Sequence, residues 1–463
     1  MLILLARRVR TPREDYDHLN IVVTGDVVKE EWFSVYIKGE KVGYTSRIIE
    51  GFSHSLILRE TSYLRLPIGG ADQEILLQGL TNLDSSLAIQ SVSFTMSTDD
   101  FDVTTTAVIT SNKIKVSLTQ DDTENKFELD IKEKLYPPSL IPEIISRDNF
   151  SKEKYTFPAF DPVTLQQGAY TVIVGREIDG KSFGVDEPLR KITLTFSGYS
   201  SVSYITADGR TVYEEGGAGI TSFAEDKDSA LKFTMDKGGS RDLLEDFAIK
   251  ILGKTRIDNP REVTSLKVRL RNFEIPAFEL DGLNQKIIQP DTLIITTSPV
   301  IAQPPDSSLL LPEAFIQSDD IRVKKKALEI TKGITDTLEI LKAINNYLYE
   351  NIEKEHRATL PSASEILKSM RGDCNEHTVL FIAMARSLGI PSKAVVGVVM
   401  MDDKFYYHSW VTAYTNGHYH FFDPTFGQYP IDATHIRLVS GSLEKQIQLI
   451  RLTNPSIWIL SYE

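Results

Sequence analysis

The feature that most constrains this chain is its single cysteine, Cys374, which lies in the run RGDCNEH at residues 371–377 of 463. One cysteine permits no intrachain disulfide, and cysteine usage does not separate a reducing from an oxidising compartment. The following run, 378–385, is apolar on nearly every face, and Gly389 and Pro391 end it as a left-handed cap and a proline end a helix. We expect Cys374 in the first turn of a buried helix, where free N–H groups and the helix dipole favour a thiolate near neutral pH.

A shorter helix is predicted just before the cysteine. Ser362 and Glu365 have the spacing of a capping box, in which each side chain bonds the other's backbone N–H. The pattern predicts a helix over about 363–370, which Gly372 breaks.

Two aromatic-rich runs, 405–415 and 418–425, follow and are joined by Asn416 and Gly417. Asn-Gly between such runs is typical of a hairpin with a two-residue type I′ turn. In that register Thr415 pairs with His418, and continuing the pairing brings Trp410 opposite Asp423.

Because strand side chains alternate between faces, His408, Trp410 and Asp423 are predicted to share one face, with His408 diagonal to Asp423. The opposite face takes His418 and His420. A one-residue bulge in the turn would invert this assignment.

Thiol, imidazole and carboxylate thus follow one another as Cys374, His408 and Asp423, the groups that cysteine-dependent acyl transfer needs. The surrounding segment, 361–441, resembles the transglutaminase-like cysteine enzymes of bacteria. The motifs that carry the resemblance are residues 372–377, 389–391, 407–410, 423–426 and 432–436. The resemblance implies a papain-like core with Cys374 as nucleophile, His408 as base and Asp423 as the residue that orients the imidazole. Asp432 and His435 belong to the last motif, and we assign them no role beyond structure.

Other residues are expected to shape the site. They are Gly372, Asn375, His377 and Trp410, although His377 is equally plausible as helix packing. The non-catalytic alternatives are a buried structural thiol for Cys374 and a turn residue for Asp423. The coincidence of several motifs in one order favours the catalytic interpretation.

The rest of the chain predicts an α+β protein whose papain-like, transglutaminase-like core follows a large antiparallel β-rich region. Period-two alternation dominates residues 31–119 and resumes after a proline cluster at 137–142. A short helix is expected over 241–252, and a helical pattern precedes the cysteine. We expect a tail at 1–20, a β-rich region at 21–236 open to division into two similar halves, a small β-rich domain with a proline-rich linker at 237–311, and the catalytic domain at 312–463.

The composition and net charge of the chain limit the classes of molecule that it is expected to bind. Residues are 41% hydrophobic and 25% charged, as in globular proteins, and the net charge of −13 argues against nucleic acid as a partner. No cofactor motif is visible, and none is expected. His418 and His420 could ligate a metal from one strand face, but a structural zinc site wants four ligands, so we expect no metal.

The predicted function is acyl transfer on amide bonds of a protein or peptide substrate through a thioester, by a cysteine peptidase or amidase or by a transglutaminase. The alternative is a catalytically degenerate protein that acts as a binding or assembly module of the cell envelope. An apolar run at 1–6 is too short to span a bilayer, so membrane association is expected only through a truncated anchor. We expect a bacterial envelope location, with the cytoplasm left open.

Overall fold

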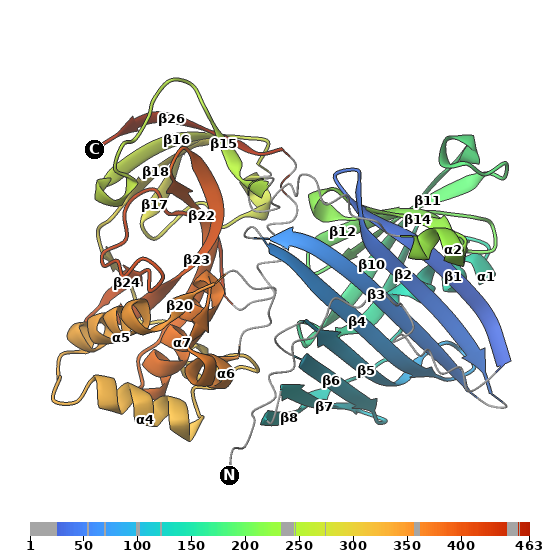
Figure 1. The fold of residues 1–463 in the computed structure, drawn as a ribbon, viewed down its shortest axis with the longest axis horizontal. Coiled ribbons are helices and arrows are strands. Elements are labelled where there is room, and N and C mark those ends of the chain that lie inside the picture. Colours follow the sequence, from blue (N-terminus) through green and yellow to red (C-terminus); the bar gives the residue numbers. More distant parts are fainter. Residues whose placement is uncertain are drawn as a thin grey trace, which may run out of the picture.

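The computed structural model describes residues 26–52, 55–68, 71–98, 102–120, 123–232, 245, 247–273, 275–355, 362–441, 452 and 454–463. Figure 1 shows two β-rich bodies side by side, with strands β1–β14 on the right and strands β15–β26 with helices α4–α7 on the left. The predicted tail at 1–20 and most of the first half of the predicted helix at 241–252 lie outside the described residues.

The N-terminal body is a single antiparallel sheet of fourteen strands, as the period-two alternation predicts. Across the sheet the order is β8 to β1 and then β14 to β9. The chain therefore starts in the middle of the sheet at β1, proceeds to one edge at β8, continues at the opposite edge with β9 and ends beside β1 at β14. The strands are β1 (Asp26–Ile37), β2 (Glu40–Gly51), β3 (Leu56–Ile68), β4 (Ala71–Leu83), β5 (Ile89–Ser97), β6 (Asp102–Ile109), β7 (Lys113–Gln120), β8 (Thr123–Asp130), β9 (Lys154–Asp161), β10 (Gln166–Ile178), β11 (Leu189–Phe196), β12 (Tyr199–Ile205), β13 (Thr211–Glu215) and β14 (Ile220–Glu225).

The proline cluster lies between the two runs of strands. There, helix α1 (Ile141–Arg147) packs its buried Ile141 and Ile145 against strands β9–β12. Strands β1 and β14 pair directly, with Phe33 opposite Ala224, and join the two runs into one sheet. The short helix α2 (Lys227–Leu231) follows β14.

The C-terminal body contains a ten-stranded sheet that draws on residues far apart in the chain. Its main order is β17-β18-β16-β26-β15-β23-β22-β25, with β24 on β23 and β19 on β24. Strands from within 237–311 therefore share one sheet with the segment after residue 392, and the division of the chain into domains stays a prediction. The strands are β15 (Ile249–Leu252), β16 (Ser265–Arg271), β17 (Gln285–Gln289), β18 (Thr292–Thr296), β19 (Val300–Ile301), β22 (Ser392–Met401), β23 (Lys404–Thr415), β24 (His418–Phe422), β25 (Ile436–Ser440) and β26 (Ser456–Tyr462).

The predicted helix at 241–252 is wrong over its last four residues, which form strand β15. Ile249 is buried and Lys250 exposed, and the strand pairs with both β26 and β23. Pairing with two long strands overrides local helical preference here, as tertiary context often does.

Four helices cover one side of this sheet: α4 (Ile321–Ile330), α5 (Thr337–Asn351), α6 (Ala363–Ser369) and α7 (Cys374–Ser387). Helix α7 is the central one, and residues 376–386 are all buried, as its apolar sequence predicts. It packs against β22 and β23 and against α4, α5 and α6. In the part of the chain that the structure describes, no helix is both long and apolar enough to cross a membrane.

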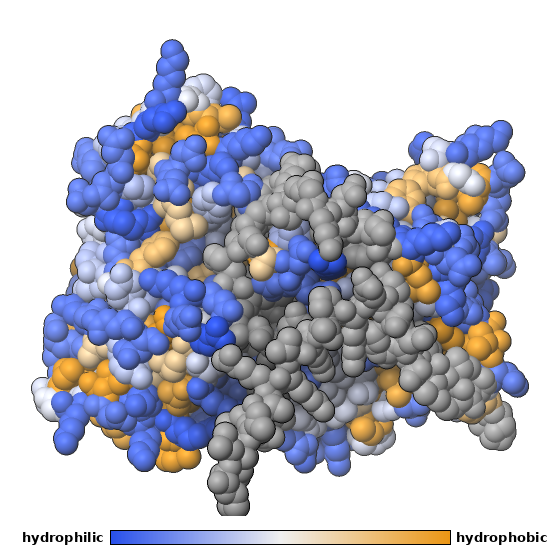
Figure 2. Space-filling view, in the orientation of Figure 1, coloured by the Kyte–Doolittle hydropathy of each residue, from blue (hydrophilic) through white to orange (hydrophobic). Residues whose placement is uncertain are grey.

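The visible surface agrees with a globular composition. Figure 2 shows a mainly hydrophilic face on which hydrophobic residues form small scattered groups. Such scattered groups are normal on a folded surface.

Helix α6 begins where the sequence predicts, but its predicted capping box is wrong. Ser362 is the N-cap residue, yet its side chain makes no capping hydrogen bond and instead contacts Gln317 and Ser364. The reciprocal capping box occurs one helix later, at α7, between Asp373 and Glu376. The starts of α6 and α7 both have the sequence pattern of a capping box, and tertiary contacts determine that the capping hydrogen bonds form only at α7.

Phe315 connects the two bodies. Its buried ring belongs to a hydrophobic cluster with Phe160, Leu165 and side chains of β2–β7. Its carbonyl oxygen accepts a hydrogen bond from the N–H of Ala363 at the start of α6, at 3.0 Å. The segment around Phe315, between the predicted linker, which ends at 311, and α4, is therefore packed between the bodies.

Replacing Phe315 by alanine should lower the free energy of unfolding by about 3 kcal/mol, since it removes a large buried side chain. Urea unfolding followed by circular dichroism measures the loss. Leu311, which is 58% exposed in the same segment, is the matched control. Leu311→Ala should change stability by less than about 0.5 kcal/mol, and an equal effect of the two variants would contradict the role given to Phe315.

Candidate active site

The start of helix α7 places Cys374 in its first turn, as the sequence predicts. Asp373 is the N-cap, and its carboxylate accepts hydrogen bonds from the N–H groups of Asn375 and Glu376. In turn, the backbone N–H of Asp373 donates a hydrogen bond to the Glu376 carboxylate, at 2.8 Å. The absence of a side chain at Gly372 allows this second hydrogen bond, because a Cβ there would lie 2.3 Å from the Glu376 side chain.

The predicted hairpin brings His408 to Asp423. Asn416 and Gly417 both have positive φ, as a type I′ turn requires, and Thr415 pairs with His418. This register puts His408 diagonal to Asp423, and His408 Nε2 lies 2.8 Å from Asp423 Oδ2. The exposed fraction is 6% for His408 and zero for Asp423.

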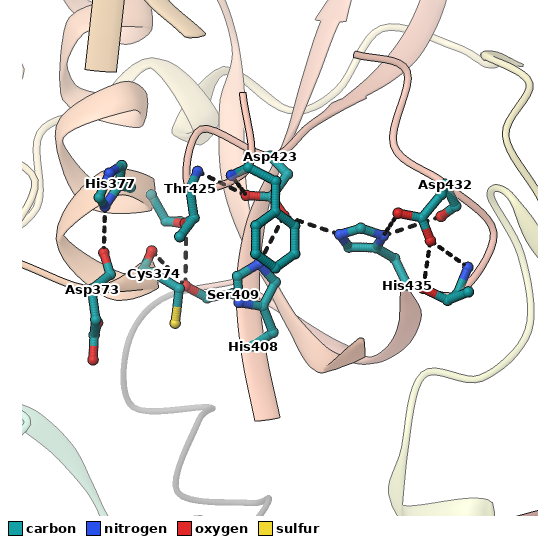
Figure 3. Close-up of polar contacts among 12 residues, drawn as sticks. Asp373, Cys374, His377, His408, Ser409, Asp423, Thr425, Asp432 and His435 are labelled. Atoms are coloured by element: carbon teal, nitrogen blue, oxygen red, sulfur yellow. Dashed lines mark hydrogen bonds and ion pairs between the residues drawn. The ribbon is translucent and has the colours of Figure 1, made fainter. Parts of the chain in front are cut away.

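Ser409 ties the cysteine to the strand that carries the histidine. Its hydroxyl donates to the carbonyl oxygen of Cys374 at 2.9 Å and lies 3.1 Å from the hydroxyl oxygen of Thr378. Figure 3 shows Cys374, His408 and Asp423 in one neighbourhood, with the thiol on the helix side and the imidazole on the strand side. The structure therefore brings the three predicted residues together from α7, β23 and the end of β24.

Four donors saturate the carboxylate of Asp423. Oδ1 accepts from the backbone N–H groups of Thr425 and Phe426, at 2.8 and 3.1 Å. Oδ2 accepts from His408 and also from His435 Nε2, at 3.1 Å. With Nε2 of His408 donating to the carboxylate, Nδ1 is the ring nitrogen left to accept a proton.

Behind Asp423, a second carboxylate engages the other side of His435. His435 Nδ1 lies 3.1 Å from the carbonyl oxygen and 3.3 Å from Oδ2 of Asp432, and Arg261 Nη1 lies 3.0 Å from that same Oδ2. His435 and Asp432 are both fully buried or nearly so. From the sequence we expected no role beyond structure for these two residues. In the structure His435 contacts the Asp423 carboxylate directly, and Asp432 contacts the other side of the His435 ring.

Aromatic rings fix the imidazole of His408 from its faces. The ring of Phe426 stacks on it, with centroids 4.9 Å apart and planes 13° apart, and the Arg261 guanidinium lies over the Phe426 ring, 4.6 Å from its centroid. Trp410, 1% exposed, lies 6.2 Å from His408 and packs edge-on against His435. Trp410, for which we expected a site-shaping role, and Phe426 thus both pack against the imidazoles of this network.

The buried charges of this network stabilise one another. Although burial alone would raise it, the pKa of Asp423 is held well below its usual range by the imidazoles of His408 and His435. Burial alone would lower the pKa of His435, but Asp432 and Asp423 raise it to about 9. At neutral pH a protonated His435 therefore lies between two ionised carboxylates.

The expected reactive thiolate is not what the environment of Cys374 favours. Burial raises the pKa of this thiol well above its ordinary value, and the nearby Asp373 carboxylate raises it further. From the sequence we expected free N–H groups at the helix start, but the side chains of Asp373 and Glu376 accept hydrogen bonds from the N–H groups there. The resting group is thus a thiol.

The remaining predicted residues have separate positions. His377 is fully buried and its Nδ1 lies 2.6 Å from the carbonyl oxygen of Asp373, so it packs under the helix start. Asn375 is half-buried and lines a cleft beside α7. His418 and His420 contact Asn416 and Tyr429.

A metal would find its best donor set at the network itself. Among the described residues, the ligand atoms of His408, Asp423 and His435 lie within 4.8 Å of one another. The separations of 2.8 and 3.1 Å on one shared oxygen are ordinary hydrogen-bond distances, so imidazole N–H groups account for the cluster.

Sequence reasoning missed Ser409, Phe426 and Arg261. Ser409 and Phe426 stand inside matched motifs, next to His408 and close to Asp423, and their position could have indicated a supporting role. Arg261 lies more than 100 residues before the cysteine and has no local signal.

If Asp373 raises the pKa of the thiol, Asp373→Asn should move the alkylation of Cys374 by iodoacetamide to lower pH. Asparagine keeps the shape and the capping ability of aspartate while it removes the charge. In the unaltered protein the labelling rate should rise only well above pH 9, because 9 is the ordinary thiol pKa and the surroundings of Cys374 raise it. Asp402→Asn, in the exposed turn between β22 and β23, should leave the curve unchanged, and labelling at neutral pH in the unaltered protein would contradict this assignment.

His435 should make stability pH-dependent. Its pKa rises from 6.5 to about 9 on folding, so its contribution is fully present below about pH 6.5 and is lost as pH rises through 9. The shift corresponds to roughly 3 kcal/mol. Urea midpoints of the unaltered protein and of His435→Gln should differ most near pH 6 and converge by pH 10, whereas His418→Gln should have no such pH dependence.

Comparison with known families follows the same segment. The model of the transglutaminase-like superfamily matches residues 324–424, about a fifth of the chain, and this range includes Cys374, His408 and Asp423. A comparison with curated proteins gives no match.

Solved structures give only loose similarity. A β-barrel-like protein of a domain of unknown function from Brucella abortus has 15% identity and a TM-score of 0.34, over 44% of this chain and 97% of its own. A proposed cysteine protease from Cytophaga hutchinsonii has 18% identity and a TM-score of 0.31, over 42% and 82%. A proposed protease from Parabacteroides distasonis has 11% identity and a TM-score of 0.22, over 76% and 64%. With TM-scores below 0.5 these similarities carry no argument, and it is the family match at 324–424 that identifies a transglutaminase-like domain in the C-terminal part of this chain.

Proposed function

We propose that this protein catalyses acyl transfer on amide bonds of protein or peptide substrates, with Cys374 as nucleophile, His408 as base and Asp423 as orienting residue. The observation that carries the proposal is the 2.8 Å contact between His408 and Asp423 beside the helix start that bears Cys374. A nucleophile, a base and a group that orients the base are the minimum for covalent catalysis of this kind.

The chemistry begins with proton transfer. As the sulfur of Cys374 attacks the amide carbonyl, Nδ1 of His408 accepts the thiol proton, while Nε2–H continues to donate to Asp423. The N–H of Cys374 lies at the helix start, outside the two N–H groups that Asp373 caps, and is the donor suited to the developing oxyanion. Imidazolium then gives the proton to the leaving amine, and the C–N bond breaks to leave a thioester.

The thioester is resolved by water or by a second amine. Water regenerates the thiol and releases a carboxylic acid, whereas an amine gives a new amide. We expect hydrolysis to predominate, because water needs no binding site of its own.

The raised pKa of Cys374 bears on the mechanism. A thiol that is protonated at rest needs His408 as a general base during attack, in place of a preformed thiolate–imidazolium pair. Fixing His408 between Phe426 and Asp423 supports this role, since a general base must be correctly placed when the substrate arrives.

The arrangement of elements also supports a papain-like core. A buried helix carries the nucleophile at its N-terminus and packs against an antiparallel sheet, whose adjacent strands β23 and β24 supply the base and lead into the orienting residue. This is the architecture that the resemblance implies.

Two assays test the function. One measures hydrolysis of fluorogenic peptide amides, and the other measures incorporation of a fluorescent primary amine into a glutamine-containing protein. Cys374→Ala should abolish both activities, and His408→Ala should lower kcat/KM by about 10²–10⁴-fold. Asp423→Asn should lower it by a similar factor through the wrong imidazole tautomer, as in serine proteases. His418→Ala, on the other face of the hairpin, is the matched control and should retain full activity.

One observation favours a second candidate, a degenerate binding or assembly module. The same raised thiol pKa would be harmless in a protein that no longer needs a nucleophile. Under that candidate, both assays give no turnover, and Cys374→Ala binds the same partners as the unaltered protein.

A further inference from the structure

A cleft of about 540 Å³ lies between the two bodies, against helix α7. Each of three segments supplies one wall. The N-terminal sheet supplies residues 125–127 of β8 and residues 164–166, which form the turn after β9 and the start of β10. The segment that connects the bodies supplies residues 312–317 and Asp319. The C-terminal body supplies Asn375, Thr378, Val379 and Ala394.

The α7 wall of the cleft adjoins the nucleophile. Asn375 follows Cys374 directly, and Thr378 lies one turn further along the same face of the helix as Cys374. The hydroxyl of Ser409 contacts both Thr378 and the carbonyl oxygen of Cys374. A molecule bound in the cleft would therefore contact Asn375 and Thr378, which lie within one helical turn of Cys374.

The lining of the cleft combines apolar side chains with amides. Phe127, Leu165 and Phe315 form an apolar wall, and Asn125 and Asn375 bring amide groups. Amide side chains can donate to and accept from a peptide backbone, while apolar walls bind a large apolar side chain. The charged residues Lys126, Glu313 and Asp319 also line the cleft. A polypeptide offers apolar, amide and charged groups together, so it can match all three kinds of lining side chain.

Leu165 has an unusual conformation for a residue in this position. Its φ is +62°, in the left-handed region that a leucine adopts only at a cost. The hydroxyl of Thr164 and the N–H of Val163 donate to Asp161 and fix the turn, and the Leu165 side chain is 9% exposed at the cleft wall. The turn thus holds an apolar side chain at the junction between the N-terminal core and the cleft wall.

The two bodies are connected by several independent contacts around the cleft. Arg386 of α7 is buried and donates to the carbonyl oxygen of Leu311 and to Glu313, both at 2.7 Å. Thr123 of β8 donates to Glu365 of α6 at 3.3 Å. These contacts, with the Phe315 ring in the N-terminal core, give the cleft walls a defined spacing.

We propose that this cleft is a substrate subsite, in which the N-terminal sheet helps bind an extended peptide and accommodates a large apolar side chain near the reacting amide. The inference rests on the proposed function and assigns the substrate class: polypeptides with a Phe- or Leu-like residue close to the target bond. The β-rich region then acts as a specificity element of the enzyme.

The test uses the full chain with Cys374→Ala, so that peptides bind without turnover. The probe is a fluorescein-labelled library of blocked hexapeptides in which each position is in turn Phe, Leu, Ser, Asp or Lys, and binding is measured by fluorescence anisotropy. At one position, Phe or Leu should bind about tenfold or more tightly than Ser or Asp, as expected for burial of a large apolar side chain.

Variants in the N-terminal wall locate the site. Leu165→Trp should fill the cleft and abolish the apolar preference. Asn125→Trp fills it from strand β8 and gives an independent result should Leu165→Trp fold poorly. Ile173→Trp, at a position on β10 that is 44% exposed, is the matched control and should keep the preference unchanged.

Two results would overturn the inference: no peptide binds, or the apolar preference survives both cleft-filling variants. Failure of the proposed function looks different, since it leaves the chain with native Cys374 unable to turn over any peptide that the Cys374→Ala chain binds. The two failures are therefore distinguishable in the same set of proteins.

Discussion

The site depends on one buried carboxylate, that of Asp423. Removing an ionised group from water is costly unless every lone pair finds a donor, and here two backbone N–H groups and two imidazoles meet that need. These four donors come from three segments: the turn after β24, strand β23 and the residue just before β25. The same four bonds that make the charge tolerable therefore set the position of His408.

Asp423 also connects the site to the part of the chain that precedes the helices. Through His435 and Asp432 the network reaches Arg261, whose guanidinium also covers the ring that stacks on His408. A residue between β15 and β16 thus supports the imidazole from behind. The shared ten-stranded sheet explains how it comes to be there, since β15 pairs with β23, the strand that carries His408.

The features that short-range sequence patterns determine were predicted correctly. The Asn416-Gly417 turn sets the hairpin register, so the contact between His408 and Asp423 followed from the sequence, and the apolar run after Cys374 specified a buried helix with correct ends. The predictions that failed depended on tertiary contacts. Ser362 turned to Gln317 in place of its capping role, residues 249–252 joined a sheet, and the helix start at Cys374 was occupied by carboxylates. The support from Arg261 and the cleft between the bodies have no local signature at all.

The electrostatics at the two ends of the site differ in a way that matters for catalysis. Around Asp423, positive and negative groups alternate and stabilise a fixed ion network, whereas around Cys374 the nearest charges are carboxylates that oppose the thiolate. Under the proposed mechanism the site holds no preformed thiolate, and the thiolate forms only when His408 takes the proton as a substrate carbonyl arrives. Under that mechanism productive positioning of the substrate is decisive, and the proposed subsite beside Asn375 and Thr378, with one wall built by the N-terminal sheet, would supply that positioning.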